Sequence, residues 1–281
     1  MAKMPDYAHK PRKRFGQNFL HDDQIIQRIV RAINPKLNDH LVEIGPGQGA
    51  LTQYLVAQCA HLDVIELDRD LVPLLQAMFS KHPHFSIHQG DALKLDFNQL
   101  KKGQPLRVVG NLPYNISTPL LFHLLSFRHL ISDMYFMLQK EVVERLAASP
   151  GENAYGRLSV MAQYFCQVDN LFIVKPGAFK PAPKVDSAIV RLIPHQSLPY
   201  PAQDSHVFEQ VVRSAFSMRR KTLRNALKGM ISAEALTSLG IDPSIRAEKL
   251  ALAEFVAMAN AIASQQSTKT KGNIDSPSNN Q

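Results

Sequence analysis

Apolar and β-branched residues occur in short runs over the first half of the chain, and longer segments of helical periodicity separate these runs. The short runs predict β-strands over residues 41–44, 62–66, 85–88, 107–110 and 133–138. The segments between them predict helices over residues 50–59, 70–81 and 118–125. Such alternation predicts an α/β domain in which helices cover both faces of a mostly parallel sheet.

Later in the chain the strand pattern fades and helices dominate. We expect helices over residues 140–148 and 157–167, and strands over 171–175 and 187–193, around the loop PGAFKPAPKVD. The Pro- and Ser-rich stretch 194–205 predicts a linker, and the helical periods beyond it include 212–228 and 248–263. The expected organisation is an N-terminal segment (1–40), an α/β domain (41–193), the linker (194–205), a small all-helical domain (206–266) and a mobile tail (267–281).

Composition narrows the class of protein. The chain has 281 residues, 45% hydrophobic and 20% charged, enough to form a sizeable core without cross-links. Its two cysteines, Cys59 and Cys166, form no CxxC pair and no cluster at metal-ligand spacing, so we expect no disulfide framework, no metal site and a reducing compartment. The basic N-terminus lacks the apolar core of a secretory signal, and no apolar stretch approaches a membrane span. These features predict a cytoplasmic protein.

Charge points to a polyanionic partner. Lys and Arg number 32 against 24 acids, a net charge of +8. Residues 1–14 carry five basic residues and one acid, and residues 213–228 carry six basic residues and no acid. On a helix over 212–228 most of these cations would share one arc: Arg213, Arg220, Lys221, Arg224 and Lys228. A break near Ser217 or Met218 would spoil that register but keep the excess charge. A merely solvated helix face stays the alternative.

A glycine-rich turn and two acids indicate a nucleoside-containing cofactor. The turn Glu43–Gly49 (EIGPGQG) lies between an expected strand and an expected helix, where glycines let a ligand approach the backbone. Glu66 ends the next strand, where an acid commonly holds ribose hydroxyls, and Asp91 follows the third, where it could bind an adenine amine. The turn also fits the looser dinucleotide fingerprint, so the cofactor's identity stays open here.

The sequence Asn111-Leu112-Pro113-Tyr114, after the fourth strand, suits methyl transfer to an exocyclic adenine amine. The lone pair of that nitrogen is delocalised into the ring, and two acceptors on its hydrogens favour the pyramidal, nucleophilic form. The Asn111 side-chain oxygen and the Leu112 carbonyl can supply both acceptors, on a backbone fixed by Pro113. Tyr114 offers a face on which an extruded base can stack. The alternative is a proline-containing strand exit without chemistry.

Six motifs in one order resemble a known family. They are GQNFL (residues 16–20), EIGPGQG (43–49), IELD (65–68), GDA (90–92), NLPY (111–114) and FKPAPKVDS (179–187). The set resembles the bacterial small-subunit ribosomal RNA adenine N6-dimethyltransferases, the kasugamycin-sensitivity enzymes, and the resemblance covers about residues 13–263. The resemblance implies a class I methyltransferase (Rossmann-like) fold and S-adenosyl-L-methionine as cofactor. The cofactor contacts that it implies are Asn18, Leu20, Gly45, Glu66, Asp91 and Asn111.

The same resemblance implies a substrate and further roles. Two neighbouring adenosines in a hairpin near the 3′ end of 16S ribosomal RNA, within the immature small subunit, would each receive two methyl groups. Phe179, in a Pro-rich loop, would form the second wall of a stacking slot opposite Tyr114, although such a residue alone is more often a core residue. From the residues alone, the segment 16–20 suits a cover over the cofactor, with an ordinary lead-in to a helix capped by Asp22 or Asp23 as the equal alternative. Glu43 would orient the turn or the cofactor's methionine end, and the cations of 213–228 would bind RNA phosphates.

Three other functions compete. The chain could be an RNA-binding assembly factor whose occupancy of the immature subunit is its main role. It could belong with the macrolide-resistance methyltransferases of large-subunit RNA, although the chain-long motif set favours the small-subunit branch. A nicotinamide oxidoreductase would explain the glycine turn but not residues 111–114. Nothing in the sequence demands an obligate protein partner or more than a monomer.

Overall fold

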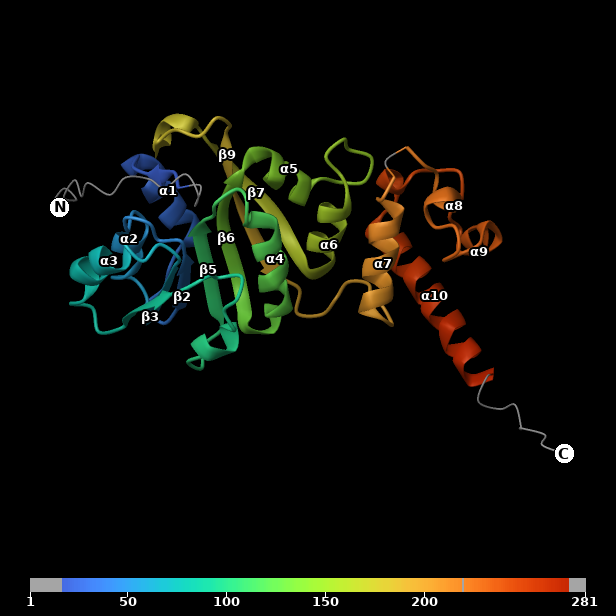
Figure 1. Cartoon of the computed structure of the whole chain (residues 1–281), viewed down its shortest axis with the longest axis horizontal. Helices are drawn as coiled ribbons and strands as arrows, with labels where there is room; N and C mark the ends of the chain where they lie inside the picture. The colour runs from blue at the N-terminus through green and yellow to red at the C-terminus, as the bar shows by residue number, and fades with distance from the viewer. Residues whose placement is uncertain (1–16, 219, 273–281) are drawn as a thin grey trace. The chain divides into compact units, whose positions relative to one another are not determined.

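The computed structural model describes residues 17–218 and 220–272. Their main feature is a seven-stranded sheet of order β4-β3-β2-β5-β6-β9-β7 (Figure 1). The strands are β2 (His40–Ile44), β3 (His61–Glu66), β4 (Phe85–Gln89), β5 (Leu106–Asn111), β6 (Ile131–Gln139), β7 (Cys166–Val174) and β9 (Ser187–Pro194). Strands β2 to β6 pair in parallel, and β9 runs antiparallel to β6. The mostly parallel α/β sheet predicted from the hydrophobic pattern is confirmed.

Alternation along the strands divides the sheet into two buried faces. Leu41 of β2, Val109 of β5 and Met137 of β6 point to one face and pack in a single cluster with the apolar sides of α1 and α3. The helices of this unit are α1 (Asp23–Ile33), α2 (Thr52–Leu55), α3 (Val72–Phe79), α4 (Ser117–Ser126) and the first half of α5 (Lys140–Ala147). Short 3-10 turns lie at Phe97–Leu100, Arg128–Leu130, Pro176–Ala178 and Ala247–Lys249.

Local signals explain where some of these helices begin and end. Asp22 caps α1 by accepting the amide hydrogens of Gln24 and Ile25, at 3.0 and 3.1 Å. By contrast α2 is much shorter than the expected helix over 50–59 and has no side-chain cap. Before α1, the short strand β1 (Phe19–Leu20) pairs antiparallel with β8 (Phe179–Lys180). This pairing joins the first motif of the chain to the last.

The described residues form two compact units, and their boundary differs from the expected one. Residues up to 143 and 167–194 form the α/β unit, whereas 144–166 join the residues from 195 onward. The helices of the second unit are α6 (Arg157–Phe165), α7 (Ser205–Ala215), α8 (Leu223–Ala226), α9 (Ala233–Ser238) and α10 (Leu252–Gly272). Helix α6 belongs there because its Tyr164 ring packs on Phe208 of α7, with ring centroids 4.2 Å apart.

Two sequence expectations about the helical unit need correction. The helix expected over 212–228 is interrupted, because α7 ends at Ala215 and α8 begins only at Leu223. The chain also stays helical in α10 to Gly272, past the expected start of a mobile tail at Ser267, while residues 273–281 lie outside the described part.

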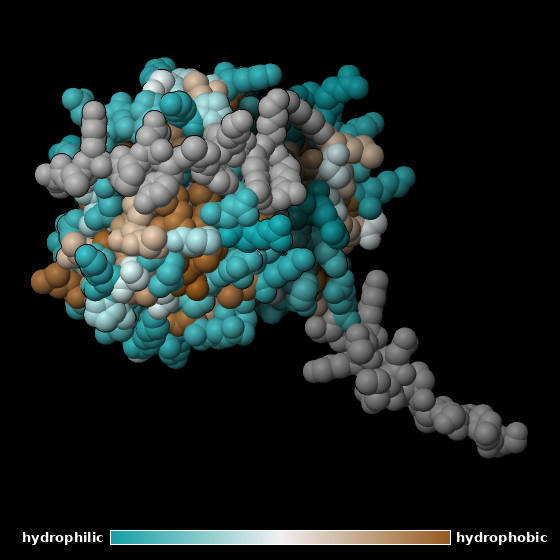
Figure 2. Space-filling view, turned by 60° about the vertical axis from the view of Figure 1, so that its left-hand side comes forward, coloured by the Kyte–Doolittle hydropathy of each residue, from teal (hydrophilic) through white to brown (hydrophobic). Residues whose placement is uncertain are grey.

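The surface is mainly hydrophilic in space-filling view, with a smaller apolar area on the face shown (Figure 2). Over the described residues, no helix is both long enough and apolar enough to cross a membrane.

Candidate active site

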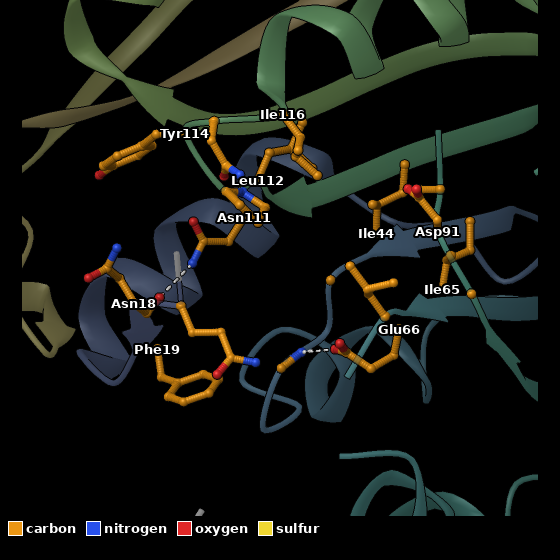
Figure 3. A pocket seen from close by; sticks show the side chains of 18 residues that line it. Asn18, Phe19, Ile44, Ile65, Glu66, Asp91, Asn111, Leu112, Tyr114 and Ile116 are labelled. Atoms are coloured by element: carbon orange, nitrogen blue, oxygen red, sulfur yellow. Dashed lines mark hydrogen bonds between the residues drawn. The ribbon is translucent and has the colours of Figure 1, made fainter. Parts of the chain in front are cut away.

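A cleft of about 950 Å³, counted to its open mouth, lies at the carboxyl edge of the sheet. Parallel strands bring their carboxyl ends to the same edge, so Ile44, Glu66 and Asn111, the last residues of β2, β3 and β5, all line it. Figure 3 shows Glu66 and Asp91 on one side of Asn111 and Tyr114 on the other. The cleft thus has an acidic end and an aromatic end, with a carboxamide between them.

The glycine turn after β2 forms the floor near the acidic end. Gly45 and Gly47 both have positive φ, at 68° and 59°, which favours glycine at these positions. A Cβ atom on Gly47 would also approach the ring of Phe19 to 3.1 Å. The turn therefore brings bare backbone close to any ligand in the cleft, as the motif predicts.

Glu66 is a buried carboxylate beside this turn, with 5% of its surface exposed. It accepts the amide hydrogens of Asp68 at 2.7 Å and Gly47 at 3.2 Å. Burial raises the pKa of Glu66 to about 7, because the charged form loses its hydration, while the backbone donors oppose the shift. Asp91, whose carboxylate accepts the Leu93 amide hydrogen at 3.0 Å, lines the same end of the cleft.

Glu43 lies below the turn rather than in the main cleft. Its carboxylate accepts a 2.6 Å hydrogen bond from the Thr52 hydroxyl. Burial raises the pKa of Glu43 to about 7, and the negative charge of Glu66 adds to the shift. Glu43 lines a smaller neighbouring cavity of about 350 Å³ together with Leu20 and Gly45. Its expected role towards the turn or the methionine end stays a prediction.

Residues 17–20 form a strap along one wall of the cleft, tied down at both ends. The Gln17 side chain donates to the Asp68 carboxylate at 3.0 Å, and the His21 amide donates to the Ala178 carbonyl at 3.0 Å. Asn18 lines the cleft, and its expected contact with the cofactor stays a prediction. Leu20 departs from expectation because it is buried in the core and reaches only the smaller cavity.

Replacing Gln17 with alanine removes the bond between the strap and Asp68. We expect a cofactor dissociation constant roughly three- to tenfold higher. This is the net cost of losing one hydrogen bond to a charged group, because water replaces part of the lost interaction with the Asp68 carboxylate. Calorimetric titration with adenosylmethionine, the cofactor that the resemblance implies, measures this constant. Gln99→Ala, an exposed glutamine remote from the cleft, is the control, and an unchanged affinity in Gln17→Ala would mean that the strap needs no such tie.

The Asn111 carboxamide has a defined orientation. Its Nδ2 donates to the Asn18 carbonyl at 3.0 Å (Figure 3). A carbonyl only accepts, so the nitrogen must face Asn18 and the Oδ1 atom must face the other way. Asn111 therefore presents an acceptor oxygen within the cleft. The amide of Leu112 donates to the Met137 carbonyl at 3.2 Å, which fixes the backbone of the next residue.

Tyr114 is held at both ends. Its hydroxyl lies 2.7 Å from the Ser187 hydroxyl, and its carbonyl accepts the Ser117 hydroxyl at 3.1 Å. Burial raises the pKa of the Tyr114 phenol, which therefore stays neutral at neutral pH. Ser117 is the first residue of α4. The sequence motif included Ser187 but gave no signal of this contact.

Comparison with known proteins decides the family. A family model described as ribosomal RNA adenine dimethylase matches residues 8–264. The chain belongs to the ribosomal RNA adenine dimethylase family. A Pseudomonas putida protein named ribosomal RNA small subunit methyltransferase A is 63% identical over 263 residues, 92% of this chain and 98% of the relative. A Marinobacter nauticus protein of the same name is 62% identical over 257 residues, 92% and 93% of the two chains.

Solved structures agree. A dimethyladenosine transferase from Plasmodium falciparum superposes with a TM-score of 0.76 at 27% identity, over 90% of this chain and 98% of that one. The 23S ribosomal RNA methyltransferase ErmE, at 24% identity and a TM-score of 0.71 over 88% and 100%, shows the fold alone. This dimethylase therefore has the expected class I methyltransferase fold and catalyses adenosylmethionine-dependent adenine dimethylation of ribosomal RNA. The family favours catalysis over a purely binding role. It also excludes the nicotinamide oxidoreductase alternative.

The cleft of this dimethylase fits S-adenosylmethionine by its own chemistry. Glu66 is a buried carboxylate beside an open cleft, suited to two ribose hydroxyls, and Asp91 adds a second acceptor at the same end. Leu67 and Ala92 line that end with apolar surface suited to a purine. The negative charge of these acids also suits a cationic sulfonium.

Phe179 requires a correction. Its ring is 4% exposed and packs in the core cluster with Leu20 and Ile189, and it does not line the cleft. The β1–β8 pairing, which sets Phe179 opposite Leu20, draws the ring into the core. In this structure Phe179 is therefore a core residue, a position that does not fit the expected exposed wall of a stacking slot.

The expected RNA-binding residues do not share one helix arc. Arg213 lies in the last turn of α7, Arg224 lies in α8, and the interruption between the two helices separates them. All five are exposed, and within the described residues none pairs with an acid: Arg213, Arg220, Lys221, Arg224 and Lys228. The segment therefore keeps its excess of exposed positive charge, although these residues do not share one helix face. Arg219 and the basic residues of 1–14 lie outside the described residues.

Proposed function

We propose that this dimethylase methylates the N6 amines of two adjacent adenosines in a 3′-terminal hairpin of 16S ribosomal RNA, within the immature small subunit. The relatives of highest identity reported above carry small-subunit names, which supports the choice of subunit. The observation that carries the mechanism is the Asn111 carboxamide, whose oxygen is turned into the cleft by the Asn18 carbonyl. We further propose that the enzyme acts as a monomer without an obligate protein partner.

Asn111 and Leu112 activate the target amine. The Asn111 Oδ1 atom and the Leu112 carbonyl accept the two amine hydrogens, which favours a pyramidal nitrogen with its lone pair out of conjugation. Pro113 fixes the backbone that presents these acceptors. Bound S-adenosylmethionine supplies a methyl group on a positively charged sulfur. Once alkylated, the nitrogen carries an acidic proton that leaves to water, so no strong base is needed.

The two ends of the cleft hold the two partners. Tyr114, opposite the acidic end, stacks the extruded adenine on its face, which contributes roughly 1–3 kcal/mol. Glu66 binds the ribose hydroxyls of the cofactor and Asp91 its adenine amine. Asn111, between them, is where nucleophile and methyl donor meet.

The exposed cations of the helical unit bind RNA phosphates. Neutralising two of them, in Arg220→Gln/Lys221→Gln, should weaken binding to small subunits and flatten the dependence of log affinity on log salt by up to roughly two units. Cofactor affinity should not change. Binding measured between low and moderate salt tests this, with Arg69→Gln/Lys81→Gln of the other unit as a charge-matched control. An equal effect of the control pair would show that only net charge matters.

Labelled adenosylmethionine offered with under-methylated small subunits, mature large subunits and free DNA tests the substrate. We expect label only in small subunits, and mass mapping should find N6,N6-dimethyladenosine at two adjacent positions. Label in large subunits would contradict the proposed substrate and favour the function of the macrolide-resistance methyltransferases. A catalytically dead variant that still supports subunit maturation would restore the assembly-factor role.

A further inference from the structure

Ser187 contacts the aromatic end of the cleft from a distant part of the chain. Its hydroxyl lies 2.7 Å from the Tyr114 hydroxyl, across 73 residues of sequence. The side chain of Ser187 is fully buried, and Tyr114 is one of the cleft-lining residues. A hydrogen bond at the tip of a tyrosine restrains the ring without covering its faces.

Ser187 is itself a rigid anchor. It is the first residue of β9 and lies opposite Gln139 of β6 in the antiparallel register. The preceding residue, Asp186, accepts the amide hydrogen of Lys140 at 2.9 Å and pairs with Lys175 at 2.7 Å. The backbone on both sides of the hydroxyl is therefore fixed.

The other end of Tyr114 is fixed as well, by the Ser117 hydroxyl on its carbonyl. With only that contact, the ring could still move between side-chain rotamers. The bond to Ser187 selects one of these rotamers before RNA binds. The entropy cost of ordering the ring therefore does not add to the barrier for methyl transfer. Neither bond touches the acidic end of the cleft.

We propose that Ser187 is a positioning residue for methyl transfer, which holds the Tyr114 ring so that the adenine stacked on it presents its amine to Asn111. The inference rests on the proposed function, in which Tyr114 stacks the target base. A stacked base that is displaced by a fraction of an ångström aligns poorly with the Asn111 oxygen. The effect therefore falls on the turnover rate and spares cofactor binding.

The test compares Ser187→Ala, Tyr114→Phe and the double variant in methyl transfer to under-methylated small subunits. Each single change should lower kcat roughly three- to tenfold, the worth of one net hydrogen bond. The double variant should lose no more than either single variant, because both remove the same bond. The cofactor dissociation constant should stay unchanged.

A matched control separates positioning from stability. Ser159 is also a fully buried serine; its hydroxyl donates to the Arg145 carbonyl in the helical unit, away from Tyr114. Ser159→Ala should lower the melting temperature and leave kcat unchanged when both are measured well below that temperature. Equal kcat losses in Ser159→Ala and Ser187→Ala would show that Ser187 acts only through stability, and would contradict the positioning role.

Tyr114→Ala distinguishes this inference from the proposed function beneath it. Severe loss in Tyr114→Ala, with normal rates in Ser187→Ala and Tyr114→Phe, overturns the positioning role and keeps the stacking role. Normal rates in Tyr114→Ala overturn the stacking role itself. Losses that multiply in the double variant also refute the inference, because the two hydroxyls would then act independently.

Discussion

Replacing Asn111 with alanine is expected to lower the methyl-transfer rate by roughly 100-fold or more, the typical cost of losing one side chain that stabilises developing charge in a transition state. The side chain is the better-defined of the two proposed acceptors, because the Asn18 carbonyl fixes which atom faces the cleft. Single-turnover rates on under-methylated small subunits measure the loss, and titration with adenosylmethionine should show that cofactor binding remains measurable.

Two further variants sharpen this result. Asn111→Asp keeps an acceptor but places a carboxylate oxygen against the Asn18 carbonyl, where the two repel, so we expect partial activity at most. Asn98→Ala removes an exposed asparagine whose side chain donates to the Asp96 carboxylate. This control variant should transfer methyl groups normally. Near-normal turnover of Asn111→Ala would remove the proposed mechanism.

The second large effect is expected at Glu66, which should control both the affinity for the cofactor and the pH dependence of that affinity. The carboxylate is buried, and its pKa is raised to about 7. Ribose hydroxyls donate to the ionised form, so binding favours ionisation and releases a proton from the fraction protonated beforehand. Affinity should therefore be highest above pH 7 and fall as the pH drops below it, by at most about tenfold per pH unit for this group.

Calorimetric titrations in two buffers of different ionisation enthalpy measure that proton release directly. Glu66→Gln should weaken binding roughly 10- to 100-fold, since charge-assisted bonds are lost and the new NH2 group comes to face one of the two backbone donors, Gly47 or Asp68. It should also remove most of the pH dependence. Glu43→Gln reports the share of Glu43, whose pKa also lies about 7. Unchanged proton release in Glu66→Gln would exclude Glu66 as the titrating group.

The sequence alone predicted the mostly parallel sheet, the edge at which the cleft lies and the family. Strand runs are local and their alternation with helices allows few topologies, while parallel strands necessarily bring Ile44, Glu66 and Asn111 to one edge. It left open whether the helix over 212–228 is continuous or breaks near Ser217 or Met218, and the structure shows the interruption after Ala215. Nor did the sequence separate a core role for Phe179 from a stacking role, since that depends on the pairing of β1 with β8.

Only the tertiary structure decided how the site is held. The bonds from Asn111 to Asn18, Tyr114 to Ser187 and Gln17 to Asp68 join residues that lie 93, 73 and 51 positions apart in the sequence. Each depends on how side chains from separate elements pack at one sheet edge, and no periodicity along the chain encodes that distance. Motifs thus identify which groups act, whereas the long-range hydrogen bonds set the direction in which those groups point.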